Sequence, residues 1–314
     1  MRLFNASPHP EEGRRPVSKG AWGYCNSRPG RLLAAMLLAV WALALPAWAH
    51  PEISMADDFE DEPLDENVWS LYRMGERHHW IDRRVVREGE GALAIRIRGS
   101  DFDPVCQCQI SEIREAPEQR LNFGEEAWYA FSFRIDGRGP VTGDQRWQIG
   151  GWKQETDGSP FLAQRFDNGV FHVTLESGES RVLVATSAGE AKSFFAQIKD
   201  GILNQFSFVS EASKYDGRDD VSIEYGLDPI LPDPRRGWVD MVYRVKGGLA
   251  HDGIVEVYAN GRFIARATGT IGVPDAQDPT QYFRFGHNRA PMPGTSTIQI
   301  DRFRRGASKA DVER

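Results

Sequence analysis

An Asn-Gly pair at residues 260–261 constrains the fold of this chain more than any other feature. The pair separates two runs rich in β-branched and aromatic residues, Gly253–Ala259 and Arg262–Arg266. A two-residue turn of type I′ needs positive φ at both positions, which Asn and Gly tolerate best. The pattern therefore predicts a tight antiparallel hairpin. A further strand is expected just upstream, over Trp238–Val245.

Short runs with period two, broken by Gly, Pro, Asn and Asp, fill most of the chain after residue 50. Asp167-Asn168-Gly169 indicates a second hairpin, and helical periodicity is confined to Gly189–Asp200. Many strands without βαβ alternation predict an all-β fold, an antiparallel β-sandwich with few short helices. The expected strands cover residues 68–72, 84–88, 92–98, 108–115, 126–135, 146–153, 161–166, 170–175, 181–186, 205–211, 221–225, 238–245, 254–259, 262–267, 281–287 and 297–304.

The two ends of this β-rich region are expected to meet. Asp58-Phe59 and Trp69 open it, and Thr297–Phe303 closes it. The first and last strands of such sandwiches commonly pair, because pairing removes an exposed sheet edge.

Residues 1–49 have the pattern of a secretory signal peptide behind a long N-terminal extension. Two arginines precede the apolar run Leu32–Pro46, which is short for a bilayer span. Ala47-Trp48-Ala49 then gives a small-x-small cleavage site, so we predict cleavage before His50 and a secreted or periplasmic protein without a membrane anchor. An uncleaved anchor is the alternative.

The region 50–314 is predicted to be one acidic domain. Its 265 residues suit a single all-β domain, since such folds often reach about 250 residues. Without residues 1–49 the chain keeps 32 basic and 43 acidic side chains, a net charge near −11. This acidity argues against nucleic acid as a partner. A local basic groove on an acidic protein still binds an acidic polysaccharide. We expect a monomer.

Two cysteines, Cys106 and Cys108, remain after signal cleavage. Residues i and i+2 of a strand lie about 6.5–7 Å apart at Cα, at the limit of disulfide geometry. A bridge therefore requires a bent chain, and free buried thiols are the alternative. Neither a second Cys pair nor a nearby His completes a metal motif.

Alternation along the strands assigns side chains to faces. Phe283 and Phe285 form an apolar row, which places Tyr282, Arg284 and Asn288 on the opposite face. The apolar rows of two further strands are Tyr129, Phe131, Phe133 and Ile135, and Phe171, Val173 and Leu175. The polar faces then carry Glu112, Arg114, Arg134 and His172. Such a face is either a substrate groove or an ordinary solvated sheet face, and both interpretations are open.

Several segments appear in the order seen in jelly-roll polysaccharide lyases. They are Ser111–Arg114, Gly124–Phe133, Trp147–Lys153, Trp238 with Asp252-Gly253 and Asn260-Gly261, and Arg284–Arg289. The set covers roughly residues 55–305 and resembles the heparin lyase I and glucuronan lyase group. The resemblance implies a concanavalin A-like jelly roll. It also implies a polysaccharide lyase that cleaves a uronic-acid-containing polymer by β-elimination.

Three tasks follow from the implied reaction. A donor must neutralise the C6 carboxylate, a base must take the C5 proton, and an acid must protonate the leaving O4 oxygen. Candidates for catalysis are Lys153, His172, Tyr282 and His287. Candidates for substrate binding are Glu112, Arg114, Arg134, Gln148, Arg284, Asn288 and Arg289.

The chain departs from the family pattern at two places. Members often carry Gln-Trp-His where this chain has Gly151-Trp152-Lys153, and Gly-x-Tyr-Arg where it has Gly286-His287-Asn288-Arg289. Lys153 serves as a base only if its surroundings deprotonate the ammonium. A non-catalytic carbohydrate-binding protein is therefore an alternative. A glycoside hydrolase is a weaker one, because no E-x-D-x-E strand motif supplies its paired carboxylates.

We predict no cofactor and no catalytic metal. The acidic run Asp57, Asp58, Glu60 and Asp61 is the one candidate for a structural Ca²⁺ site, although acidic runs are usually just solvated.

Overall fold

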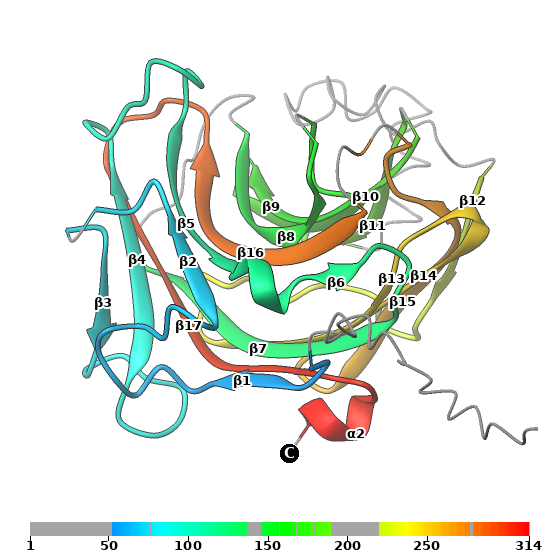
Figure 1. The fold of residues 1–314 in the computed structure, drawn as a ribbon, viewed down its shortest axis with the longest axis horizontal. Coiled ribbons are helices and arrows are strands. Elements are labelled where there is room, and N and C mark those ends of the chain that lie inside the picture. Colours follow the sequence, from blue (N-terminus) through cyan, green and yellow to red (C-terminus); the bar gives the residue numbers. More distant parts are fainter. Residues whose placement is uncertain are drawn as a thin grey trace, which may run out of the picture. The chain divides into compact units, whose positions relative to one another are not determined.

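Two antiparallel sheets form the part of the chain that the computed structural model describes: residues 52–313 apart from 76, 137–145, 157, 168, 179, 190–219, 275, 277 and 278. All of these belong to one unit, Trp48–Arg314. In Figure 1, β16 and β8 of one sheet curve above β7 and β17 of the other. The predicted all-β jelly-roll sandwich is confirmed.

The strands of sheet A lie in the order β12 (Val221–Tyr225), β15 (Arg262–Ile271), β14 (Gly248–Ala259), β13 (Val239–Lys246), β7 (Ala127–Asp136), β17 (Thr295–Gly306), β4 (Ala92–Arg98) and β3 (His79–Asp82). A further short strand, β1 (Met55–Asp57), pairs with β17. The strands of sheet B lie in the order β11 (Ser180–Thr186), β10 (Val170–Ser177), β9 (Leu162–Asp167), β8 (Trp147–Gln154), β16 (Thr280–Arg289), β5 (Gln109–Glu115) and β2 (Trp69–Tyr72). A further short strand, β6 (Leu121–Asn122), pairs with β16. The described helices are short: η1 (Pro117–Gln119) and α2 (Lys309–Val312). None of the described helices is long and apolar enough to cross a lipid bilayer.

Both predicted hairpins form. Ala259 pairs with Arg262, which leaves Asn260 and Gly261 as the turn, with φ of 50° and 73° as a type I′ turn requires. β9 and β10 form the second hairpin, closed by the pair Asp167 and Val170; residue 168 lies outside the described part.

Some local predictions are wrong or untested. The strand expected over 84–88 is absent, and β3 lies just before it. The Asp82 carboxylate accepts hydrogen bonds from the amides of Arg84 and Val85 (2.9 and 3.3 Å), which turns the chain there. The short strands β1 and β6 were not expected. The strand expected over 205–211, and all but the first residue of the helix expected over 189–200, lie outside the described residues.

The two ends of the domain pair as expected, but through the unexpected strand β1, whereas β2, which matches the first expected strand, pairs with β5. β1 aligns with the end of β17, with Asp57 opposite Phe303. Asp57 accepts a hydrogen bond from the Trp69 indole (2.7 Å), and Trp69 packs edge-on against Phe303 at 4.8 Å between ring centroids. These contacts close one edge of the sandwich core.

The apolar rows of the strands face each other between the sheets, as alternation predicted. Phe131 of β7 packs against Phe283 of β16 with ring centroids 5.2 Å apart. The ring centroid of Trp152 on β8 lies 5.1 Å from that of Tyr129 and 4.7 Å from that of Tyr243. Because these residues turn inward, their neighbours along β8 and β16 turn to the outer face of sheet B.

One ion pair joins the two sheets inside this core. Arg305 of β17 donates to Glu115 of β5 at 2.8 Å, and neither side chain is exposed to solvent. The other Glu115 oxygen accepts the backbone amide of Phe283 at 2.9 Å. A buried charge is tolerated only when it is paired and hydrogen-bonded, which this geometry provides.

Replacing Arg305 with Met should lower the free energy of unfolding by about 3–5 kcal/mol, because the Glu115 carboxylate would remain buried without its partner. Arg302→Met on the same strand is the matched control. Its ion pair with Glu88 (3.0 Å) is partly exposed, so a change within about 1 kcal/mol is expected. Urea denaturation measures both, and equal losses would contradict a special role for the buried pair.

Candidate active site

A cavity of about 600 Å³ lies on the outer face of sheet B, over β8, β16, β5 and β2. Its lining residues are Tyr72, Arg73, Cys106, Cys108, Ile110, Arg114, Arg146, Gln148, Lys153, Glu155, Thr156, Gly158, Ser159, Tyr282, Arg284 and Asn288. Five of these described residues are basic and one is acidic. The cavity therefore attracts anions although the whole chain is acidic.

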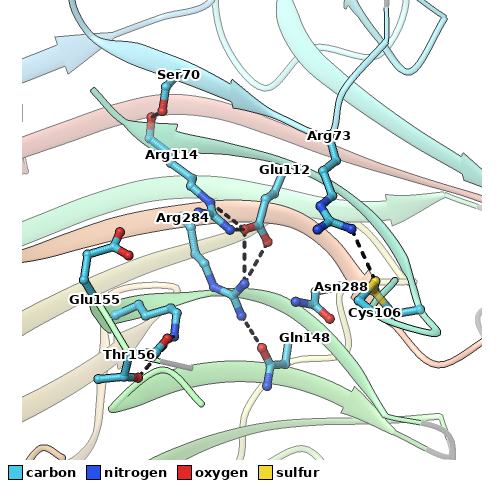
Figure 2. Close-up of polar contacts among 12 residues, drawn as sticks. Ser70, Arg73, Cys106, Glu112, Arg114, Gln148, Glu155, Thr156, Arg284 and Asn288 are labelled. Carbon is cyan, nitrogen blue, oxygen red and sulfur yellow. Dashed lines mark hydrogen bonds and ion pairs between the residues drawn. A yellow bond between two sulfur atoms is a disulfide. The ribbon is translucent and has the colours of Figure 1, made fainter. Parts of the chain in front are cut away.

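Glu112 of β5 holds two arginines at the floor of this cavity (Figure 2). Arg284 of β16 donates through Nη1 to both carboxylate oxygens, at 2.9 and 3.2 Å. Arg114 donates through Nε to Glu112 Oε1 at 2.8 Å, and its Nη2 lies 2.7 Å from the same oxygen. Opposite Glu112 on β16 stands Gly286, with φ of 139°; a Cβ there would lie 2.3 Å from the Ser111 carbonyl oxygen, so only glycine lets the two strands approach.

Two amide side chains lie next to this cluster. Gln148 of β8 and Asn288 of β16 are direct cross-strand partners, and Figure 2 shows them on neighbouring strands beside Arg284. Arg284 donates to the Gln148 amide oxygen, and Arg146 donates to that of Asn288 (3.2 Å). Arginine carries donors only, so it must face the oxygen of each amide. Each NH₂ group is thereby turned away from its arginine and is oriented as a donor.

Lys153 is the cavity group whose pKa lies near neutrality. Burial, followed by the charge of Arg284, lowers the pKa of Lys153 to about 8. Its Nζ donates to the carbonyl oxygens of Thr156 (2.6 Å) and Gly158 (2.8 Å) and to the Thr156 hydroxyl (3.3 Å). A neutral amine has two hydrogens and one lone pair, so the two shorter, carbonyl contacts survive deprotonation, and the contact with the hydroxyl is given up for the lone pair that accepts a proton.

Tyr282 is the direct cross-strand partner of Lys153. Burial raises the pKa of Tyr282 to about 12, so it is a protonated phenol at neutral pH. Among the described residues its hydroxyl has no hydrogen-bond partner. The ring lies beneath the Arg120 guanidinium, 4.4 Å from its centroid, and Arg120 in turn binds Glu155 at 3.0 Å. Tyr282 itself lines the cavity, so its phenol is reached from there.

His172 lies on the outer face of sheet B as predicted, but it is not among the residues that line the cavity. It pairs with Arg165 on β9, which pairs with Gln148 on β8. Burial, followed by the charge of Arg165, lowers the pKa of His172 to about 3. A base this weak is poorly matched to proton abstraction near neutral pH.

Three other predicted site residues point elsewhere. His287 faces the core, where its ring stacks on Trp147 and its Nε2 lies 3.0 Å from the Ile95 carbonyl; burial lowers its pKa to about 3. Arg289 also faces inward and donates to Gln109 at 2.7 Å. Arg134 lies on β7, in sheet A. The grouping of these three with the groove is corrected: two alternate to the inner face, and one belongs to the other sheet.

The acidic run proposed for Ca²⁺ does not converge. Asp58 pairs with Arg304, Glu60 accepts the Glu90 amide, and Asp57 binds Trp69. No cluster of three or more His, Cys, Asp or Glu suited to a metal occurs among the residues that the structure describes.

Comparison with known proteins identifies the family of this chain. The family model described as "Polysaccharide lyase" matches residues 69–304, about three quarters of the chain. The chain belongs to the polysaccharide lyase family. No curated protein sequence matches it. Among solved structures, it is similar to the endo-β-1,4-glucuronan lyase of the fungus Trichoderma reesei, with a TM-score of 0.53, 15% identity, and 82% of this chain and 97% of that chain covered. It is also similar to the family 7 alginate lyase A1-II′, with a TM-score of 0.48, 13% identity, and 81% and 99% covered.

The family membership makes this protein an enzyme, a lyase acting on polysaccharides, and the predicted family is confirmed. The cavity also contains residues that the sequence pattern did not single out. Tyr72, Arg73, Arg146 and Glu155 all line it, yet each lies at a strand end or in a loop, outside the alternating rows. The charge of Arg73 and Arg146 beside strand ends was the available signal.

Proposed function

We propose that this lyase cleaves a uronic-acid-containing polysaccharide by β-elimination, with the amide pair of Gln148 and Asn288 as the group that binds the C6 carboxylate. The observation that carries the proposal is the fixed orientation of both amides by Arg284 and Arg146. Preorganised donors stabilise charge that develops on the carboxylate when the C5 proton leaves. Neighbouring guanidiniums make the two NH₂ groups stronger donors than isolated amides.

Lys153 is the base in this proposal. Its neutral amine takes the proton from C5, the C4–O4 bond breaks, and a C4–C5 double bond forms. Tyr282 donates its hydroxyl proton to O4, the leaving oxygen. Since Lys153 and Tyr282 are cross-strand partners, the Lys153 ammonium returns a proton to the phenolate after each turnover.

We further propose that the enzyme is exported, as the signal-peptide pattern of residues 1–49 predicts. The Cys106–Cys108 disulfide supports this proposal, because structural disulfides persist mainly in oxidising compartments. Mass spectrometry of the protein from its producing cells tests it, since a mature chain beginning at His50 is expected.

Purified protein incubated with glucuronan, alginate and heparin-type polymers should generate the ultraviolet absorbance of an unsaturated uronate from at least one of them, since β-elimination leaves a C4–C5 double bond. Saturated reducing ends would indicate hydrolysis, and binding without any product would indicate a carbohydrate-binding protein. Either result would reject the proposed reaction.

The role of Gln148 is tested in the same assay with Gln148→Glu, whose side-chain carboxylate would repel the C6 carboxylate of the substrate. We expect at least a 100-fold loss of kcat/KM on the free uronate polymer. The loss of kcat/KM on a methyl-esterified polymer should be smaller, because the C6 group of that polymer carries no charge. Equal losses on both substrates would mean that Gln148 does not contact the carboxylate.

Activity should rise with pH and reach a plateau above about pH 8, because the pKa of Lys153 is lowered and only the neutral amine accepts a proton. Below that pH the ammonium dominates and the rate falls. Lys153→Arg keeps the cation permanently protonated, so it should remove most activity together with the rise near pH 8. A wild-type profile without an inflection in that region would exclude Lys153 as the base.

The proton donor is tested with two matched variants, Tyr282→Phe and Tyr72→Phe. Each removes one hydroxyl and keeps the ring that stacks on Arg114. We expect Tyr282→Phe to lower kcat by about 10²–10⁴-fold, the usual contribution of a general acid, and Tyr72→Phe to change it little. The opposite ranking, at equal thermal stability, would move the role to Tyr72.

A further inference from the structure

The end of the cavity nearest β2 is walled by a loop that contains a disulfide. Cys106 and Cys108 are bonded, with their Cα atoms 5.1 Å apart. The bend that the sequence spacing required is supplied by Gln107, whose φ is 49°. Asp103 and Cys108 also exchange backbone hydrogen bonds at 2.8 and 3.3 Å. The hydrogen bonds close the loop 103–108, the disulfide fixes residues 106–108 within it, and both cysteines line the cavity.

This loop holds Arg73. The Asp103 carboxylate forms an ion pair with Arg73 Nη1, and the same nitrogen donates to Cys106 Sγ at 3.6 Å. Figure 2 shows Arg73 directed at Cys106, beside Glu112 and above Asn288. Arg73 itself has φ of 53°, in the left-handed region that non-glycine residues rarely adopt. Such strain persists where the surroundings impose it and is concentrated at functional sites.

The held guanidinium still has donors to offer. The ion pair and the hydrogen bond of Arg73 to described residues both use Nη1, and the guanidinium also lies 5.3 Å from the Tyr72 ring centroid, so the Nε and Nη2 hydrogens are not engaged by these contacts. The side chain is about one third exposed and lines the same cavity as the amide pair. Planar guanidinium donors suit carboxylate and sulfate groups.

We propose that Arg73, held by the disulfide-containing loop 103–108, forms a second anion-binding subsite. It binds the carboxylate or sulfate group of a sugar unit next to the unit that is cleaved. The proposal rests on the proposed function, because a polymer with an anionic substituent on successive units is needed to reach both places. Arg73 is a positioning residue and takes no part in proton transfer.

Steady-state kinetics on a size series of uronate oligosaccharides and on the polymer test the subsite. Arg73→Gln should raise KM for the polymer by roughly three- to tenfold, as expected for one partly exposed charged contact. It should leave kcat unchanged, and it should have no effect on the shortest substrate that is cleaved. Arg77→Gln is the control, because Arg77 is an exposed arginine outside the cavity lining and carries the same charge. An unchanged KM, or an equal effect of Arg77→Gln, would overturn the subsite.

The role of the loop is tested by reduction. Dithiothreitol converts the disulfide to two thiols and is itself oxidised to its cyclic disulfide. The reduced wild-type enzyme should show the same rise in KM as Arg73→Gln. Reduction of the Arg73→Gln variant should raise its KM no further, because both changes act on one contact. An equal further rise in the KM of the reduced variant would show that the loop acts without Arg73. The double variant Cys106→Ser/Cys108→Ser checks the result without a reductant.

Affinity electrophoresis in gels that contain the same polymers separates this inference from the proposed function. If no polymer is cleaved, the proposed reaction fails, and the subsite stands only if Arg73→Gln is retarded less than Arg77→Gln. If Gln148→Glu abolishes cleavage while Arg73→Gln changes neither KM nor retardation, the subsite alone fails. Absence of any retardation of the wild-type protein would overturn both.

Discussion

A single buried carboxylate, Glu112, organises the polar side of the cavity. A charge in this position is stable only when it is fully paired, so two guanidiniums converge on it. Each arginine then fixes a further group: Arg284 orients the Gln148 amide, and Arg114 lies 3.3 Å from the Tyr72 ring centroid. Without Glu112 the two guanidiniums would repel each other, and the orientation of the remaining groups would be lost.

Alternation explains how much of this site the sequence could predict. On β16 the inward residues Phe283 and Phe285 are among the most apolar of the chain, so the outward direction of Tyr282, Arg284 and Asn288 followed from the pleat alone. The same rule placed Glu112 and Arg114 together on β5. The turn chemistry of Asn260-Gly261 likewise set one hairpin of sheet A. In each case the deciding interaction lies within a few residues of sequence, where period and turn type are sufficient.

The remaining features depend on partners far away in sequence. Arg134 alternates correctly to an outer face, but only the strand order shows that its strand lies in sheet A. The pairing of Gln148 with Asn288 requires a register shift between Phe285 and Asn288, which no local pattern announces. His287 was grouped with the groove by motif, although alternation with Phe283 and Phe285 places it inside. The Cys106–Cys108 bridge depended on the backbone of Gln107, whose left-handed φ is unusual for its residue type.

The proposed base, Lys153, stands where the resemblance places a histidine, and burial explains why a lysine suits this position. Desolvation disfavours the cationic form of any base and lowers its pKa. A histidine starts at 6.5, and complete burial carries the pKa of His172 and His287, which lie outside the cavity, to about 3, too low for a useful base. A lysine starts at 10.5, and the same effect with the charge of Arg284 brings it to about 8, near the pH at which proton transfer is efficient. If the enzyme acts on an acidic polymer, as proposed, the basic lining of the cavity that would attract the polymer also lowers the pKa of Lys153 toward the range of a useful base.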